Sequence, residues 1–167
     1  MINEYYYLVA SLPYLEFAKA LPIARDEFLS QSSKWLSPSD FLMLSNIDIN
    51  DFKIRTGDPG LLKEWKLFDL TLREGLAEVR RVKKSSLHTK IPDSVKNIFE
   101  ESNPLLMERQ IQKTRWDFLE EKEFGYHFDI NVLIVYHLKL QVLERLTAFN
   151  KEKGETMFSR LCEVTYG

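Results

Sequence analysis

Residues 129–149 constrain the fold more than any other part of the sequence. When successive residues are placed about 100° apart around a helix axis, apolar side chains cover most of the circumference. These side chains are Val132, Val135, Tyr136, Leu138, Leu140, Val142, Leu143, Leu146 and Phe149. A helix that is apolar on nearly every side must be surrounded by other helices. Because Lys139 and Arg145 interrupt residues 130–146, that segment is too short and too charged to cross a bilayer. We therefore interpret it as a core helix.

One narrow polar stripe remains on this helix, and it consists of His137, Gln141, Glu144 and Arg145. Three interpretations are open. In the first interpretation, the stripe is the solvent side of a helix that is packed on its other sides. Alternatively, it is a buried polar network, or a groove where a partner docks its own charges, with Gln141 and Glu144 as interface residues. Finally, it is a metal or catalytic site built around His137 and Glu144. The four residues are our candidate partner interface.

Helix starts are indicated by capping residues. Ser37, Asp58 and Asn103 each precede a proline, which is the usual order of an N-cap residue and a first-turn residue. Asp129 is the expected N-cap of the last long helix, and Gly125 the expected C-cap of the one before it. The pattern predicts helices over about 24–36, from 38 onward, 59–84, 92–102, 104–124, 129–149 and 156–163.

Glycine and proline are scarce, with 6 residues each, which disfavours an all-β chain because such chains need many tight turns. Residues 4–12 fit a short strand or a first helix about equally well. The sequence contains no internal repeat, and the loop at 85–91 is the best candidate for a hinge. We predict an all-α fold, a single-domain bundle of about six or seven helices over residues 1–167.

The charge balance and the cysteine content limit the class of protein. With 23 basic and 25 acidic side chains the net charge is -2, whereas nucleic-acid-binding domains of this size usually carry a basic excess. The single cysteine, Cys162, cannot form an intramolecular disulfide, which suits a reducing compartment. Residues 1–7 lack the basic start and apolar run of a signal peptide. We expect a cytoplasmic protein that binds no nucleic acid.

A search for catalytic or metal-binding patterns gives no constellation. His88, His127 and His137 are not spaced as zinc or di-iron ligands, and the glycines form no phosphate loop. The acidic run at 120–123 is typical of a solvated helix face, and the basic run at 80–84 of a helix C-terminus. We therefore predict no catalytic, cofactor-binding or metal-ligating residue, and a binding protein rather than an enzyme.

Two stretches resemble a known family. The first is residues 5–13, and the second is residues 103–105, 115–119 and 128–129, leading into 136–145 with the sequence YHLKLQVLER. Together they are similar to a bacterial family encoded among the subunits of V-type (A/V-type) ATPases. That family is in turn similar to the C subunit (d in eukaryotes), an all-helical part that caps the membrane rotor ring and receives the central stalk.

The resemblance implies a non-catalytic subunit or accessory factor of a bacterial V-type ATPase. Its partners would be other ATPase subunits of the stalk or rotor, and it would lie at the inner face of the membrane through the complex, without inserting itself. It implies no catalytic residue and no cofactor. An assembly subunit should also expose a larger apolar patch than a monomer needs. The alternative is a free-standing helical protein-interaction adaptor that is unrelated to the ATPase.

Overall fold

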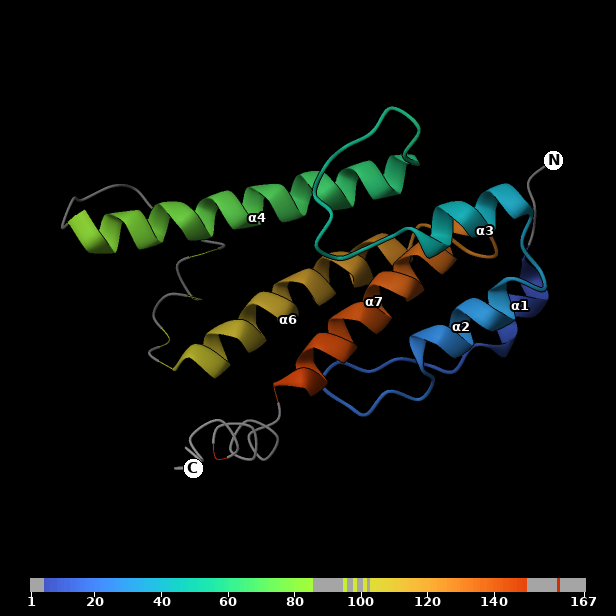
Figure 1. Cartoon of the computed structure of the whole chain (residues 1–167), viewed down its shortest axis with the longest axis horizontal. Coiled ribbons are helices and arrows are strands. Elements are labelled where there is room, and N and C mark those ends of the chain that lie inside the picture. Colours follow the sequence, from blue (N-terminus) through green and yellow to red (C-terminus); the bar gives the residue numbers. More distant parts are fainter. Residues whose placement is uncertain are drawn as a thin grey trace, which may run out of the picture.

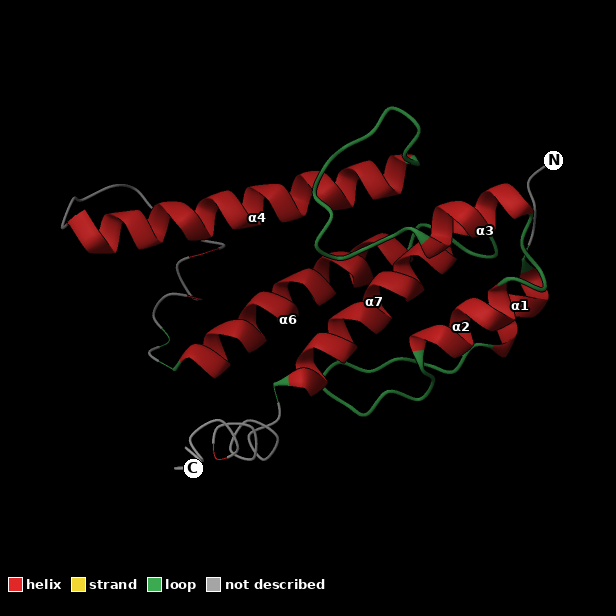
Figure 2. Ribbon diagram, viewed as in Figure 1, coloured by secondary structure: helices red, strands yellow, loops and turns green. Residues whose placement is uncertain are grey.

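The structure is a computed structural model that describes residues 5–85, 103–149 and the single positions 95, 98, 101 and 159. The described part contains six helices, and none of its residues lies in a β-strand (Figure 2). The helices are α1 (Tyr6–Ser11), α2 (Arg25–Ser32), α3 (Pro38–Ser45), α4 (Gly60–Ser85), α6 (Pro104–Glu123) and α7 (Ile130–Ala148). The prediction of an all-α fold is confirmed. Residues 6–11 form a helix, which settles the alternative left open for 4–12.

Helix α7 is the centre of the bundle. It packs against α6 on one side and against α2 and α3 on the other (Figure 1). Every residue from 132 to 143 is buried, including the polar ones. Helix α4 lies over α6, where the ring of Phe68 stacks on that of Phe118 with centroids 4.1 Å apart. The apolar pattern of residues 129–149 thus predicted correctly that this helix is enclosed on all sides.

Three helices begin where the capping residues predicted. The Ser37 hydroxyl accepts a hydrogen bond of 3.2 Å from the Asp40 N–H at the start of α3. The Asn103 side chain accepts from the N–H two residues later, at 2.9 Å, at the start of α6. The Asp129 carboxylate accepts from the N–H groups of Asn131 and Val132, at 3.1 and 3.2 Å. Each of these side chains satisfies N–H groups that a helix N-terminus leaves without a partner.

The fourth predicted cap, Asp58, is wrong. Helix α4 begins at Gly60, and the Pro59 carbonyl accepts the first helical hydrogen bond, from the Lys63 N–H at 3.0 Å. The Asp58 carboxylate turns to the preceding loop instead, where it accepts hydrogen bonds from the Arg55 N–H at 2.9 Å and from Lys66 Nζ at 2.8 Å. The Asp58 carboxylate therefore bonds to a lysine and to a loop N–H, and not to the N–H groups at the start of α4.

Two predicted helix ends also differ. Helix α2 ends at Ser32 and not near residue 36, because residues 34 and 35 continue in turns that bond to carbonyls three residues back. Phe124 and not Gly125 is the C-cap of α6, and no glycine in the described ranges has a positive φ. The helix therefore ends without the left-handed glycine that the sequence suggested.

Some predictions fall largely or wholly outside the described residues. These are the helix at 156–163, of which only position 159 is described and is helical, Cys162, and the loop at 85–91 with His88, of which only Ser85 is described, as the last residue of α4. Of the helix at 92–102, positions 95 and 98 are described and helical, and position 101 is described and not helical. Within the described part, no helix combines the length and the apolar character that crossing a membrane requires.

Candidate functional site

The four residues of the predicted polar stripe do not form one surface. His137 and Gln141 are 1% and 3% exposed, whereas Glu144 and Arg145 are partly exposed. The interpretation as a solvent side is therefore wrong for the first two, and the buried polar network describes them. Whether any of the four contacts a partner stays a prediction. Glu144 and Arg145 are accessible to a partner as the structure stands, whereas His137 and Gln141 are covered by other parts of the chain.

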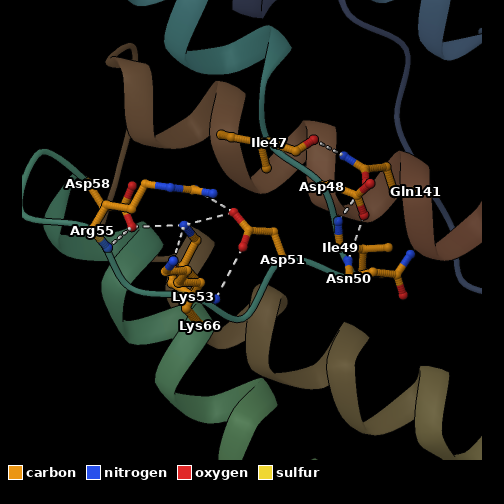
Figure 3. A network of polar contacts seen from close by, with 10 residues as sticks. All are labelled: Ile47, Asp48, Ile49, Asn50, Asp51, Lys53, Arg55, Asp58, Lys66 and Gln141. Carbon is orange, nitrogen blue, oxygen red and sulfur yellow. Dashed lines mark hydrogen bonds and ion pairs between the residues drawn. The ribbon is translucent and has the colours of Figure 1, made fainter.

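Gln141 binds the backbone of the loop between α3 and α4 (Figure 3). Its side-chain oxygen accepts a hydrogen bond of 2.8 Å from the Ile49 N–H, and its nitrogen donates one of 2.9 Å to the Ile47 carbonyl. The amide group thus pairs with two backbone groups as a neighbouring strand would. Because these groups are buried, they need such a partner, and Gln141 supplies it from the middle of α7.

His137 binds the end of α3 in a similar way. Its Nδ1 lies 3.0 Å from the Leu44 carbonyl oxygen, which can only accept, so Nδ1 carries the proton. Nε2 is then an acceptor, and this buried atom has no hydrogen-bond partner among the described residues. Burial lowers the pKa of His137 to about 4, and the positive charge of Arg25 acts in the same direction. The imidazole is therefore neutral at pH 7.

The two outer residues of the stripe form ion pairs. The Glu144 carboxylate lies 3.8 Å from Arg25 Nε of α2, and both side chains are open to solvent. Arg145 donates a hydrogen bond of 2.6 Å to the Glu108 carboxylate of α6. The same carboxylate oxygen accepts from Gln112 Nε2 at 2.8 Å. Arg145 is therefore the outer member of a set of polar contacts that continues inward along α6.

The inner members of this set join α6 to α4. Arg115 Nη2 lies 2.7 Å from Asp69 Oδ1, and Arg115 Nε donates to the same oxygen at 2.9 Å. The other Asp69 oxygen accepts from Arg73 Nε at 2.6 Å. Asp69 and Arg115 are both buried, and burial lowers the pKa of Arg115 despite the neighbouring carboxylate. Sequence reasoning missed this pair, because its members lie 46 positions apart and no local pattern connects them.

The loop between α3 and α4 is fixed at a second point by Lys66, which is only 3% exposed (Figure 3). Its Nζ donates to the Lys53 carbonyl at 2.9 Å and to Asp58 at 2.8 Å, and lies 3.3 Å from the Asp51 carboxylate. Burial alone would raise the pKa of both carboxyl groups, but hydrogen bonds from Arg55, Lys66 and backbone N–H groups outweigh it. The pKa of each is therefore below its usual value.

A hollow of about 370 Å³ lies between this loop and α4. Asp48, Asp51, Asp58, Arg55 and Lys66 supply its charged lining, and Met43, Ile47 and Leu62 part of its apolar lining. Asp51 and Asp58 are already bonded to the two cations, so these charges serve to shape the loop. Within the described ranges, no three His, Cys, Asp or Glu side chains lie close enough together to hold a metal ion.

A family model described as a protein of unknown function (DUF2764) matches residues 61–165, more than half of the chain. The chain belongs to this family. No curated protein and no solved structure matches it. The residues that hold the loop, which are Lys66, His137 and Gln141, lie inside the DUF2764 match, whereas the loop itself and the end of α3 precede it. The DUF2764 segment thus supplies the anchors, and the preceding segment supplies the backbone that they hold.

The structure also shows a surface that the sequence did not reveal. Four exposed rings form a continuous row, from Trp35 over Tyr7 and Tyr6 to Phe128, with centroids 5.9, 5.8 and 4.5 Å apart. We call these four residues the aromatic surface. Tyr7 is 72% exposed, and Phe124, in the same turn as Phe128, is 92% exposed. Sequence reasoning missed this surface because aromatic residues are by default expected in a core. Three of the four rings also lie outside the residues that the DUF2764 model matches.

Proposed function

We propose that this protein is a non-catalytic subunit or accessory factor of a bacterial V-type ATPase, resembling the C/d coupling subunit. In this role it binds other subunits of the stalk or rotor and lies at the inner face of the membrane through them. The proposal starts from the resemblance of residues 5–13 and of the blocks between 103 and 145 to the family found with these ATPases. Three observations on the structure support it.

The blocks that carry the resemblance meet in space. The Tyr136 hydroxyl donates a hydrogen bond of 2.9 Å to the Pro13 carbonyl, and burial raises the pKa of Tyr136, so the hydroxyl keeps its proton. The Tyr5 N–H donates to the Phe128 carbonyl at 2.7 Å. Segments that are more than a hundred residues apart thus form one packed unit. This is expected if the resemblance reflects a shared fold.

The observation that carries the proposal is the aromatic surface. Burying aromatic rings stabilises a folded chain, and four rings that remain 41–72% exposed leave much of that stabilisation unrealised in the isolated protein. Tyrosine, tryptophan and phenylalanine are the residues that protein–protein interfaces favour at their cores. An exposed aromatic surface is therefore what an assembly subunit, or an accessory factor that binds one, needs.

The internal polar contacts suit a part that transmits force. Gln141, His137 and Lys66 attach the α3–α4 loop to α7 and α4, and the Asp69–Arg115 pair attaches α4 to α6. Such contacts raise the free energy of local opening, so that the helices move together. A coupling subunit needs this stiffness together with interface area, and it needs neither a nucleophile nor a proton donor.

The test is an affinity pull-down of the tagged protein from its native cells at moderate salt, analysed by mass spectrometry. We expect recovery of catalytic or stalk subunits of the V-type ATPase. A tagged Tyr7→Ala/Trp35→Ala variant should recover fewer of them, while a Leu67→Ala variant, which changes an exposed apolar residue on α4, should recover the same amount. Recovery of no ATPase subunit from cells that express the machine would contradict the proposal and leave the free-standing adaptor.

A further inference from the structure

The chemistry of the partner follows from the charges beside the aromatic surface. Glu120 and Glu121 are exposed at the end of α6, one turn before Phe124. Asp129 follows Phe128 directly, and its carboxylate caps α7. Asp40 accepts a hydrogen bond from the Tyr5 hydroxyl, beside Tyr6. The segments that bear the rings are therefore continuous with, or hydrogen-bonded to, segments that bear four carboxylates, in α3, at the end of α6 and in the α6–α7 turn.

Among the described residues close to these carboxylates in sequence, few positive charges balance them. Lys34 is exposed next to Trp35. Lys122 lies between the two glutamates and Phe124 in sequence, but its Nζ is paired with Glu64 of α4 at 2.6 Å. Lys139 is buried and paired with Glu123. The described residues of these segments therefore carry an excess of negative charge, although the whole chain carries a net charge of only -2.

This sign disfavours two of the possible occupants. A second copy of the chain, joined through the same surface on both copies, would bring carboxylates against carboxylates. A bilayer with anionic lipids would be repelled, since such membranes attract basic segments. A basic protein segment has the opposite sign, and its arginine and lysine side chains also bind aromatic faces. The chain itself uses that contact, with Lys139 Nζ 4.9 Å from the ring centroid of Trp116.

We propose that the aromatic surface docks a basic amphipathic segment of a partner protein, whose apolar side chains contact Tyr7 and Trp35 while its lysines and arginines face Glu120 and Glu121. The inference rests on the proposed function only in that the protein acts by binding, and it does not require that the partner belong to an ATPase.

The experiment is a selection of random displayed peptides on the immobilised, purified full chain. We expect enriched sequences that combine lysine or arginine with aromatic or leucine residues.

One enriched peptide is then synthesised and its affinity for the protein is measured. Tyr7→Ala/Trp35→Ala should weaken binding by about tenfold or more, as expected for central interface residues. Glu120→Lys/Glu121→Lys should weaken it as well, and added salt should weaken binding to the wild type more than to this charge-reversed variant. Leu67→Ala is the matched control and should bind like the wild type.

Both double variants change exposed side chains, and their unfolding curves verify that they are folded. The inference is overturned if no peptide is enriched, if the enriched peptides are acidic or uncharged, or if neither double variant weakens binding. It is also overturned if sedimentation shows a dimer that Tyr7→Ala/Trp35→Ala abolishes, or if the protein co-sediments with anionic vesicles through these rings. Because the selection uses no ATPase subunit, a positive selection with a negative pull-down removes the ATPase assignment alone. A failed selection with a positive pull-down contradicts the basic partner segment alone and leaves the ATPase assignment in place.

Discussion

The side-chain oxygen of Gln141 accepts a hydrogen bond from the backbone N–H of Ile49, a residue 92 positions earlier in the chain. The same amide group also donates to the Ile47 carbonyl, so one side chain satisfies two buried backbone groups. Its neighbours in α7, Leu140 and Val142, are apolar and cannot replace it. At Ile47 and Ile49 the α3–α4 loop is therefore held by a single residue of the central helix, while Lys66 of α4 holds it at a second point.

Gln141→Leu should lower the free energy of unfolding by about 2–6 kcal/mol, because it leaves two buried backbone groups unsatisfied and each costs about 1–3 kcal/mol. Urea unfolding measures the loss, and hydrogen exchange should show faster exchange of the Ile49 amide than of amides at the centre of α6. A Gln141→Leu variant as stable as the wild type would contradict the anchoring role.

His137→Asn should make stability less dependent on pH. The folded pKa of about 4 lies below the ordinary value of 6.5, so the unfolded chain binds the proton more readily. The associated stability is present above pH 6.5 and is lost as the pH falls toward 4, by about 1.4 kcal/mol per unit. Between pH 7 and 5 the wild type should thus lose about 2 kcal/mol more than the variant. Asparagine keeps a donor for the Leu44 carbonyl, so the variant removes the titrating ring and retains this contact.

Lys66→Met should destabilise the protein by about 2–4 kcal/mol at pH 7, because it leaves two partly buried carboxylates without their shared cation. The pKa values of Asp51 and Asp58 are lowered in the folded state, so their contribution is present above the usual carboxyl pKa. It is lost as the pH falls through the lowered values, that is, below about pH 4. The stability curves of variant and wild type should therefore approach each other in acid. A constant difference down to pH 2 would show that the charge of Lys66 is not responsible.

Asp69→Asn should cost about 3–5 kcal/mol, because it leaves the buried guanidinium of Arg115 without a counter-charge. The double variant Asp69→Leu/Arg115→Met removes both buried charges, and buried ion pairs replaced by apolar residues are often neutral. Chemical denaturation should find the double variant more stable than Asp69→Asn. If it were less stable, the two charges would contribute separately, through other contacts such as that between Asp69 and Arg73.

Local patterns were sufficient for most helix positions and for the central helix. Ser37, Asn103 and Asp129 bond to N–H groups two or three residues away, so a short stretch of sequence contains all that the cap requires. The burial of α7 followed from its apolar periodicity for the same reason. The cap predicted at Asp58 was wrong because Lys66, eight residues later, competes for its carboxylate.

The polar contacts of the core could not be predicted in this way. The stripe on α7 was visible, but the partners of His137 and Gln141 lie 92 to 94 positions away on a loop and a helix end. Whether a polar residue on an apolar helix is solvated or bonded depends on that distant backbone. The aromatic surface was hidden for the opposite reason, because the sequence alone does not distinguish an exposed ring from a buried one.

The enclosure of α7 has a consequence for the order in which the protein can form. Leu44, Ile47 and Ile49 leave the ribosome long before His137 and Gln141, and Pro13 precedes Tyr136 by more than a hundred residues. During synthesis the first half of the chain therefore exposes apolar side chains and backbone groups whose partners do not yet exist. Such a nascent segment is prone to aggregate or to bind chaperones until the last long helix is translated. Truncation within α7 should consequently prevent the N-terminal half from folding, although none of its own residues is removed.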